Sequence, residues 1–177
     1  MKKIILLALI VVSFSCKNKE KQTPKEEPKK EAEVKKPEKF IIEATFKLEK
    51  SDDFRLFANG IFVNNTRTMN LSITEEVTRS ENKQTLIFDL PEGVRPDYEV
   101  GINLGSKERK RIEFLEVKIS YGDIEFIATP NKISDLFYLN EYINYTPENG
   151  VFQTQDANGK HNPIMYLKKD IVDQLNF

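Results

Sequence analysis

The chain has 177 residues, with 27 basic and 28 acidic side chains, one cysteine, one histidine and no tryptophan. A single cysteine excludes an internal disulfide bond, so the folded part must be stabilised by packing. Residues 40–177 hold 16 basic and 22 acidic side chains, a net charge near −6, and we therefore expect no nucleic-acid partner.

The first 15 residues have the layout of a secretory signal peptide. Lys2 and Lys3 precede an apolar run from Ile4 to Val12, and small residues stand directly before Cys16. A membrane-spanning helix needs about 20 apolar residues, so this run is expected to target the chain without spanning a membrane. The segment VVSFSC, residues 11–16, resembles a bacterial lipoprotein signal, in which a peptidase cleaves before the cysteine and diacylglycerol is attached to its sulfur.

The resemblance implies that Cys16 is a lipidation site and the mature N-terminus. Its neighbours offer no core for a buried thiol, no base for a catalytic thiol and no second cysteine for a metal site. In such lipoproteins an aspartate after the cysteine often directs retention in the inner membrane, whereas this chain has Lys17 there. The expected location is therefore the outer membrane facing the periplasm, with the cell surface as the alternative.

A charged linker is predicted after the cysteine, within residues 16–39. Residues 17–39 hold nine lysines, six glutamates and three prolines, with almost nothing apolar to bury. Such a segment is expected to be disordered and to reach at most about 75–80 Å when extended. The sequence thus predicts a signal over 1–15, a tether over 16–39 and one folded domain over 40–177.

The domain alternates apolar and polar side chains with a period of two, which predicts strands with one buried face. The alternation runs through residues 40–48 and recurs in 69–74, 85–90 and 98–104. The predicted inward-facing residues are Phe40, Ile42, Ala44, Phe46, Leu48, Met69, Leu71, Ile73, Leu86, Phe88, Leu90, Tyr98, Val100, Ile102 and Leu104.

Two hairpins and a bulge are predicted between these strands. Asn59-Gly60 lies between apolar runs and favours a type I′ turn, which would pair Ala58 with Ile61, Phe57 with Phe62 and Leu56 with Val63. The apolar phase changes near Phe114-Leu115, where a β-bulge would turn both apolar sets toward the core. Gly122-Asp123 predicts a second hairpin leading into Ile124, Phe126 and Ala128.

Helical signals come late in the chain. Asn131 is the predicted N-cap of a short helix carrying Ile133, Leu136 and Phe137, and Asp170 is predicted to begin another with Ile171, Val172 and Leu175. Residues 141–145 and 151–155 are predicted strands, and 156–163 a loop.

These elements predict an all-β fold. Eight to ten antiparallel strands, with one or two short helices near the C-terminus, indicate an antiparallel β-sandwich of the jelly-roll type, and a closed barrel is the alternative. The rhythm of the strands is similar to that of the sandwiches in carbohydrate-binding modules and galactose-binding-like domains.

The sequence shows no catalytic pattern. His161 stands alone in the predicted loop, with no serine or cysteine marked as a nucleophile. Asp52-Asp53 and Glu75-Glu76 are adjacent pairs whose side chains point to opposite faces of a strand, so they are predicted to be turn and surface charges. Asp52-Asp53 could alternatively supply calcium ligands, but no spaced calcium loop accompanies them. We expect no enzyme activity, cofactor or metal site.

The densest ligand-like segment lies between residues 138 and 153. Tyrosine rings offer flat faces to sugars or peptides, and amides both donate and accept hydrogen bonds. The alternative is that these tyrosines close one end of the sandwich. The predicted binding residues are Tyr138, Asn140, Tyr142, Asn144, Tyr145 and Gln153.

Together the features predict a lipid-anchored envelope protein with a non-catalytic binding domain for a glycan, a cell-wall polymer or an envelope protein. The alternative is a structural or accessory subunit of an envelope complex, without a small-molecule site. A binding domain should present a sheet face with exposed tyrosines and amides, whereas an accessory subunit should present an apolar patch or an open sheet edge.

Overall fold

The structure is a computed structural model that describes residues 38–62 and 67–175. The predicted signal peptide, Cys16 and the linker up to residue 37 lie outside the described residues. Among the helices in the described ranges, none is long and apolar enough to cross a membrane.

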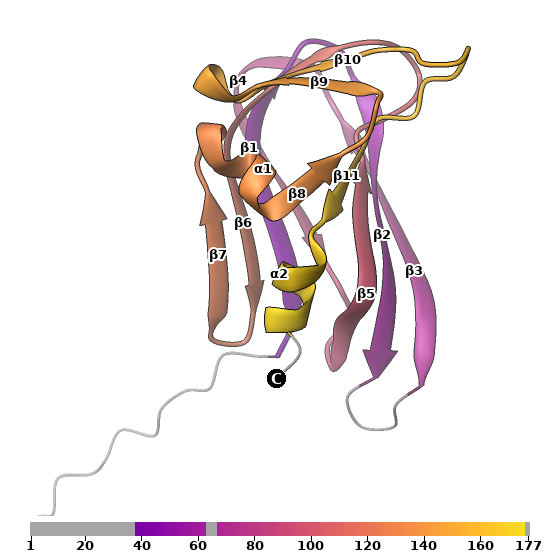
Figure 1. The fold of residues 1–177 in the computed structure, drawn as a ribbon, viewed down its shortest axis with the longest axis vertical. Helices are drawn as coiled ribbons and strands as arrows, with labels where there is room; N and C mark the ends of the chain where they lie inside the picture. The colour runs from indigo at the N-terminus through magenta and orange to yellow at the C-terminus, as the bar shows by residue number, and fades with distance from the viewer. Residues whose placement is uncertain (1–37, 63–66, 176–177) are drawn as a thin grey trace, which may run out of the picture. The chain divides into compact units, whose positions relative to one another are not determined.

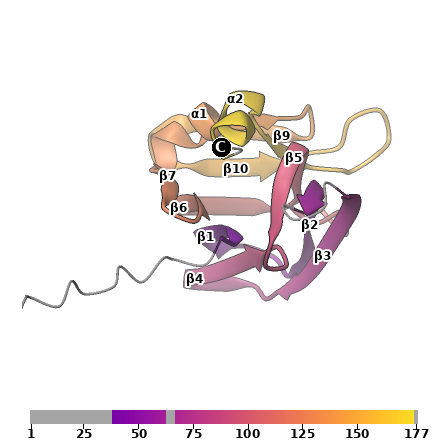
Figure 2. The same cartoon turned by 90° about the horizontal axis from the view of Figure 1, so that it is seen from below.

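Two antiparallel sheets pack face to face, as Figures 1 and 2 show, so the predicted β-sandwich is confirmed. Sheet A has the order β4-β1-β6-β10-β9, with β7 also paired to β6, and sheet B has the order β3-β2-β5-β11-β8. Sheet A contains β1 (Phe40–Leu48), β4 (Ser80–Asp89), β6 (Arg111–Tyr121), β7 (Ile124–Ala128), β9 (Ile143–Thr146) and β10 (Val151–Thr154). Sheet B contains β2 (Asp52–Phe62), β3 (Thr68–Val77), β5 (Val94–Asn103), β8 (Phe137–Leu139) and β11 (Ile164–Leu167).

The helical segments are short. They are η1 (Pro130–Lys132), α1 (Ile133–Leu136), η2 (Pro147–Asn149) and α2 (Lys169–Gln174). The helix predicted at Asp170 is confirmed with Ile171 and Val172 inside it, but it begins one residue earlier and ends before Leu175, which is its C-cap. The predicted cap at Asn131 is wrong: Thr129 is the N-cap of η1, and Asn131 lies inside it because the Pro130 ring favours the first helical position. Phe137 begins β8 and is not part of α1.

Local alternation predicts several strands correctly. Every second residue of β1 is buried, from Phe40 to Leu48. Thr45 of β1 lies opposite Glu116 of β6, and the next residue of β1, Phe46, lies opposite Phe114. Leu115 of β6 is therefore the extra residue of the predicted bulge. The hairpin at Gly122-Asp123 is confirmed as well, with Tyr121 paired to Ile124.

The predicted turn at Asn59-Gly60 is wrong. β2 runs straight through both residues, and they pair with Asn70 and Met69 of β3. A Cβ on Gly60 would lie 2.7 Å from Cγ1 of Val94, so the glycine is needed here for the close approach of β5. Of the pairs expected from that turn, the one with Val63 lies outside the described residues.

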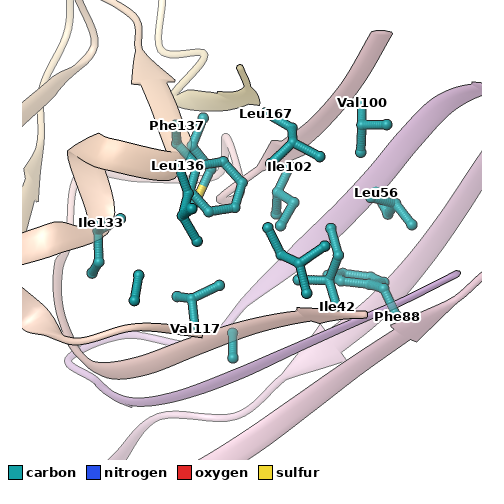
Figure 3. Packing of buried hydrophobic residues seen from close by; sticks show 14 of the residues in the cluster. Ile42, Leu56, Phe88, Val100, Ile102, Val117, Ile133, Leu136, Phe137 and Leu167 are labelled. Atoms are coloured by element: carbon teal, nitrogen blue, oxygen red, sulfur yellow. The ribbon is translucent and has the colours of Figure 1, made fainter. Parts of the chain in front are cut away.

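The core between the sheets is apolar and includes side chains from both, such as Ile42 and Phe88 from sheet A and Leu56 and Ile102 from sheet B (Figure 3). A chain of aromatic contacts crosses it. The successive ring centroids are 5.6 Å apart for Phe54–Phe46, 5.6 Å for Phe46–Phe114, 4.8 Å for Phe114–Phe152 and 4.9 Å for Phe152–Tyr145. Tyr145, one of the predicted binding residues, is therefore partly buried and packs against the core.

Candidate functional site

The six predicted binding residues do not form one surface. Tyr138 is 63% exposed on the outer face of sheet B. Asn144 and Gln153 lie opposite each other on β9 and β10 and are exposed on the outer face of sheet A. The two sheets place these groups on opposite sides of the sandwich.

The other three predicted residues have structural contacts. Tyr142 is buried, and the Tyr145 hydroxyl donates a hydrogen bond to the carbonyl oxygen of Pro130. The Asn140 side chain accepts from the backbone N–H groups of Tyr142 and Ile164 at 3.3 and 3.1 Å, and donates to the Asn162 carbonyl at 2.8 Å. Its amide thus joins the β8–β9 connection to β11, which leaves it engaged within the fold.

The structure instead shows a row of aromatic side chains across sheet B, which we name the aromatic face. Phe57 of β2 lies opposite Gly101 of β5, Gly101 lies opposite Tyr166 of β11, and Tyr166 lies opposite Tyr138 of β8. Directly opposed residues of a sheet project to the same side. Because Leu56, Ile102 and Leu167 beside them are buried in the core, the row points outward.

Gly101 makes room for this row. A Cβ at Gly101 would lie 2.2 Å from Cζ of Phe57, so the Phe57 ring lies across the glycine. The ring meets Tyr166 edge to face, with centroids 5.8 Å apart and an interplanar angle of 76°. Edge-to-face packing of this kind holds both rings in fixed orientations, as a preformed binding surface requires.

A bulge on β5 adds a further tyrosine. Ala58 lies opposite Val100 and Gly60 opposite Pro96, so the pairing advances two residues on β2 and four on β5. The extra residues bring Tyr98 to the surface, where it is 64% exposed. The prediction that Tyr98 faces the core is therefore wrong, because its alternation with Val100 is broken at this bulge.

The bulge borders a shallow groove of about 390 Å³. Its polar lining includes Asn59, Asn70 and Glu99, and Asn59 Nδ2 donates to Glu99 Oε2 at 3.2 Å. The rings of Phe57 and Tyr98 also line it. Aromatic rings beside amide and carboxylate groups are suited to hold a polyhydroxylated ligand by stacking and hydrogen bonding.

Charged side chains of both signs lie near the aromatic face. Burial, followed by the negative charges of Glu99 and Glu141, raises the pKa of Tyr166 above its ordinary value of 10.0. The Tyr166 hydroxyl therefore remains protonated at neutral pH. Lys168 Nζ lies 5.3 Å from the Tyr138 ring centroid, in the range of a cation–π contact.

A second groove, of about 450 Å³, lies over one end of sheet A. Its lining includes Lys47, Arg79 and Arg111. Each of these cations has a carboxylate within 3.3 Å: Glu113 for Lys47 and Arg111, and Glu81 for Arg79. Because its charges are locally neutralised, this groove has less to offer a charged ligand than its size suggests.

The adjacent carboxylate pairs do not form an acid–base site. Glu75 and Glu76 are exposed, as predicted, but Asp52 is buried and paired with Lys110, so its prediction as a surface charge is wrong. Within the described ranges, no group of three His, Cys, Asp or Glu side chains could hold a metal ion. His161 Nδ1 lies 3.1 Å from both the Gln155 carbonyl and Asp156 Oδ1, contacts that hold the 156–163 loop.

Sequence reasoning misses Phe57, Tyr98 and Tyr166 as surface residues. The local patterns give Phe57 a hairpin partner and turn Tyr98 inward, and β11 is only four residues long, too short for its alternation to be recognised. Gly101 inside a strand is the available signal, since such a glycine often marks a close approach of another side chain or strand.

No protein-family model matches the chain, and neither the curated proteins nor the solved structures include a significant match to it.

Proposed function

We propose that the chain is an envelope lipoprotein, anchored by lipid on Cys16, whose β-sandwich is a non-catalytic binding domain for a glycan or cell-wall polymer. The observation that carries the proposal is the aromatic face, where Phe57, Tyr166 and Tyr138 lie in one row beside the groove at Tyr98. Sugar rings present apolar C–H faces and hydroxyl edges, which match tyrosine rings and nearby amides.

The net charge of the domain supports a neutral glycan as the ligand. Glu99 and Glu141 act on Tyr166, and residues 40–177 carry a net charge near −6. A phosphate-rich polymer would meet unfavourable charge here, whereas uncharged sugars would not. We therefore expect uncharged or weakly charged saccharides to bind best.

The experiment is a glycan array and a peptidoglycan pull-down with the full lipidated chain in detergent micelles. Tyr138→Ala should weaken binding at least about fivefold, since truncating an aromatic side chain that contacts the ligand commonly costs more than 1 kcal/mol. Ile127→Ala is the matched control, because Ile127 is similarly exposed at 53% but lies on sheet A. Equal binding by the wild type and Tyr138→Ala would contradict the assignment to this face.

The lipid anchor and its location have separate tests. Cys16→Ser should release the chain from the membrane fraction, because no other lipid attachment is proposed. Protease treatment of intact cells should leave the domain in place if it faces the periplasm. Release of the domain without lysis would instead support display on the cell surface.

A structural or accessory subunit is the second candidate, and the outer edge of β3 favours it. β3 is an end strand of sheet B, paired only with β2 among the described strands. An open edge of this kind is suited to pairing with another strand. If the array and the pull-down show no binding while an envelope protein co-purifies, the accessory function takes precedence.

A further inference from the structure

Most of the outer edge of β3, residues 68–74, lacks the usual protection against strand pairing. β3 forms one margin of the domain in both views (Figures 1 and 2) and spans ten residues, which pair with β2 without a register shift from Asp52–Val77 to Ile61–Thr68. Residues 68–74, TMNLSIT, contain no charge and no proline. Natural edge strands are usually short, bulged, or marked by charged residues, lysine in particular, or proline.

The other edges in the described part of the chain are protected in these ways. β7, β8 and β9 have only five, three and four residues. β4 is as long as β3, but it carries Glu81 and Lys83, and its pairing with β1 shifts register between Phe46 and Leu48. β3 also carries charge, at Glu75 and Glu76, but its uncharged run over residues 68–74 is longer than any in the other described edge strands.

The sequence of β3 is complementary to itself. About Leu71, the order is Thr68-Met69-Asn70 on one side and Ser72-Ile73-Thr74 on the other. Antiparallel pairing of two copies about Leu71 places threonine opposite threonine, Met69 opposite Ile73, and Asn70 opposite Ser72. The apolar residues are thus opposite apolar residues on the inner side, and the polar residues are opposite polar residues on the outer side.

Burial and charge favour the same register. Met69, Leu71 and Ile73 pack against the core but stay only half-buried, so cover by the same residues of a second copy would bury more of them. The next pair in this register places Glu75 of one copy opposite Arg67 of the other, at both ends of the interface. Opposite charges across a strand pair are stabilising.

We propose that β3 pairs with β3 of a second copy of this chain, in the antiparallel register centred on Leu71. The pairing is isologous, so it closes as a dimer and does not propagate as a fibre. It joins two five-stranded B sheets into one sheet of ten strands. This inference does not depend on what the aromatic face binds.

The dimer would also strengthen binding of a polymer, and this step rests on the proposed function of the aromatic face. The two-fold axis of an antiparallel pair is perpendicular to the sheet, so both aromatic faces point to the same side. A polymer could then contact both, with avidity that can exceed the single-site affinity by about 10²–10⁴.

Disulfide cross-linking of the full chain in detergent micelles tests the register. In the Asn70→Cys/Ser72→Cys variant, the cysteine at position 70 of each copy lies opposite the cysteine at position 72 of the other. Their Cα separation of about 4.5–5.5 Å permits a disulfide. Lys83→Cys/Thr85→Cys is the matched control on β4. The unsubstituted chain reports any cross-link through Cys16.

The expected result is a dimer band on a non-reducing gel for the β3 variant alone. A monomer, or equal dimer from the β4 variant, would overturn the proposal. A cross-link to a different protein in native envelopes would also overturn it, and would assign the edge to a heterologous partner.

A charge-swap pair provides an independent test by sedimentation. Asn70→Lys/Ser72→Lys and Asn70→Glu/Ser72→Glu should each be monomeric, because like charges would face each other across the interface. Mixing them should restore a dimer containing one copy of each. Failure of the mixture to associate, with both variants folded by circular dichroism, would contradict strand pairing at this edge.

Discussion

The ammonium group of Lys110 lies 2.6 Å from Oδ2 of Asp52, and the two side chains are 0% and 1% exposed. Lys110 immediately precedes β6 of sheet A and Asp52 begins β2 of sheet B, so the ion pair joins the two sheets. Lys110 Nζ also donates to the carbonyl oxygens of Leu104 and Gly105, at 3.3 and 3.2 Å. All three donors of the ammonium group are therefore satisfied.

Removing one partner of this pair should be strongly destabilising. Lys110→Met would leave the Asp52 carboxylate buried without its counter-ion, which typically costs about 3–5 kcal/mol in the free energy of unfolding. Lys107→Met is the control, because Lys107 and Asp53 form a pair that is 57% and 45% exposed. Exposed pairs contribute about 0–1 kcal/mol. Urea unfolding of the three proteins measures both differences.

A second variant tests whether the unpaired charge of Asp52 causes the loss of stability in Lys110→Met. Asp52→Asn/Lys110→Met removes the buried charge but keeps an oxygen that can accept from the backbone N–H of Asp53, 2.8 Å from Asp52 Oδ1. The double variant should be more stable than Lys110→Met alone. If the double variant is the less stable of the two, the unpaired charge of Asp52 does not explain the lower free energy of unfolding of Lys110→Met.

Gly105 is predicted to be intolerant of a side chain. Its φ is +86°, and a Cβ there would lie 2.2 Å from Cγ of Asp52. Gly159 has a similar φ of +70° but nothing within 4 Å, so it separates backbone strain from collision. Gly159→Ala should cost about 1–2 kcal/mol, the usual penalty for the left-handed region. Gly105→Ala should lower the free energy of unfolding clearly more than Gly159→Ala does. Equal urea midpoints for the two variants would contradict a collision with Asp52.

Local patterns predicted the parts of this fold that depend on neighbouring residues. The alternation in β1 and the bulge at Leu115 follow from apolar residues that must face one core. Asn59-Gly60 could not be resolved locally, because the same dipeptide suits a type I′ turn and a strand approached closely by Val94.

The candidate site is less predictable from local patterns, because its residues are brought together only by the fold. The aromatic face is assembled from four strands that are far apart in sequence, and Tyr138 alone of the six predicted residues lies on it. A lysine is ordinarily expected at the surface. That Lys110 is buried depends on Asp52, which precedes it by 58 positions.

Acid stability should depend in part on Glu113. A hydrogen bond from Lys47, and a further one from Arg111, lower the pKa of Glu113 below its ordinary value of 4.5. A carboxylate with a lowered folded-state pKa stabilises the fold above its unfolded pKa, and the contribution disappears as pH falls through the folded value. Glu113→Gln should therefore lower the free energy of unfolding near pH 7 and reduce the further loss of stability as the pH falls below about 4.5.

The measurement for Glu113 is urea unfolding at several pH values from 7 downward. Glu116→Gln is the charge-matched control on the same strand, since no hydrogen bond or ion pair joins Glu116 to Lys47 or Arg111. An unchanged slope of stability against pH in Glu113→Gln would contradict this role.

The aromatic face should be sensitive to a single methyl group at Gly101. In Gly101→Ala the added Cβ would lie 2.2 Å from Cζ of Phe57, so the ring must leave its position against Tyr166. Overpacking of this kind typically costs about 1–3 kcal/mol, and the displaced ring should weaken glycan binding. The variant Phe57→Ala/Gly101→Ala relieves the collision and should recover stability relative to Gly101→Ala, but not binding, because the ring is absent. Thermal unfolding and the glycan pull-down separate the two effects, and full binding by the double variant would show that Phe57 is not part of the ligand site.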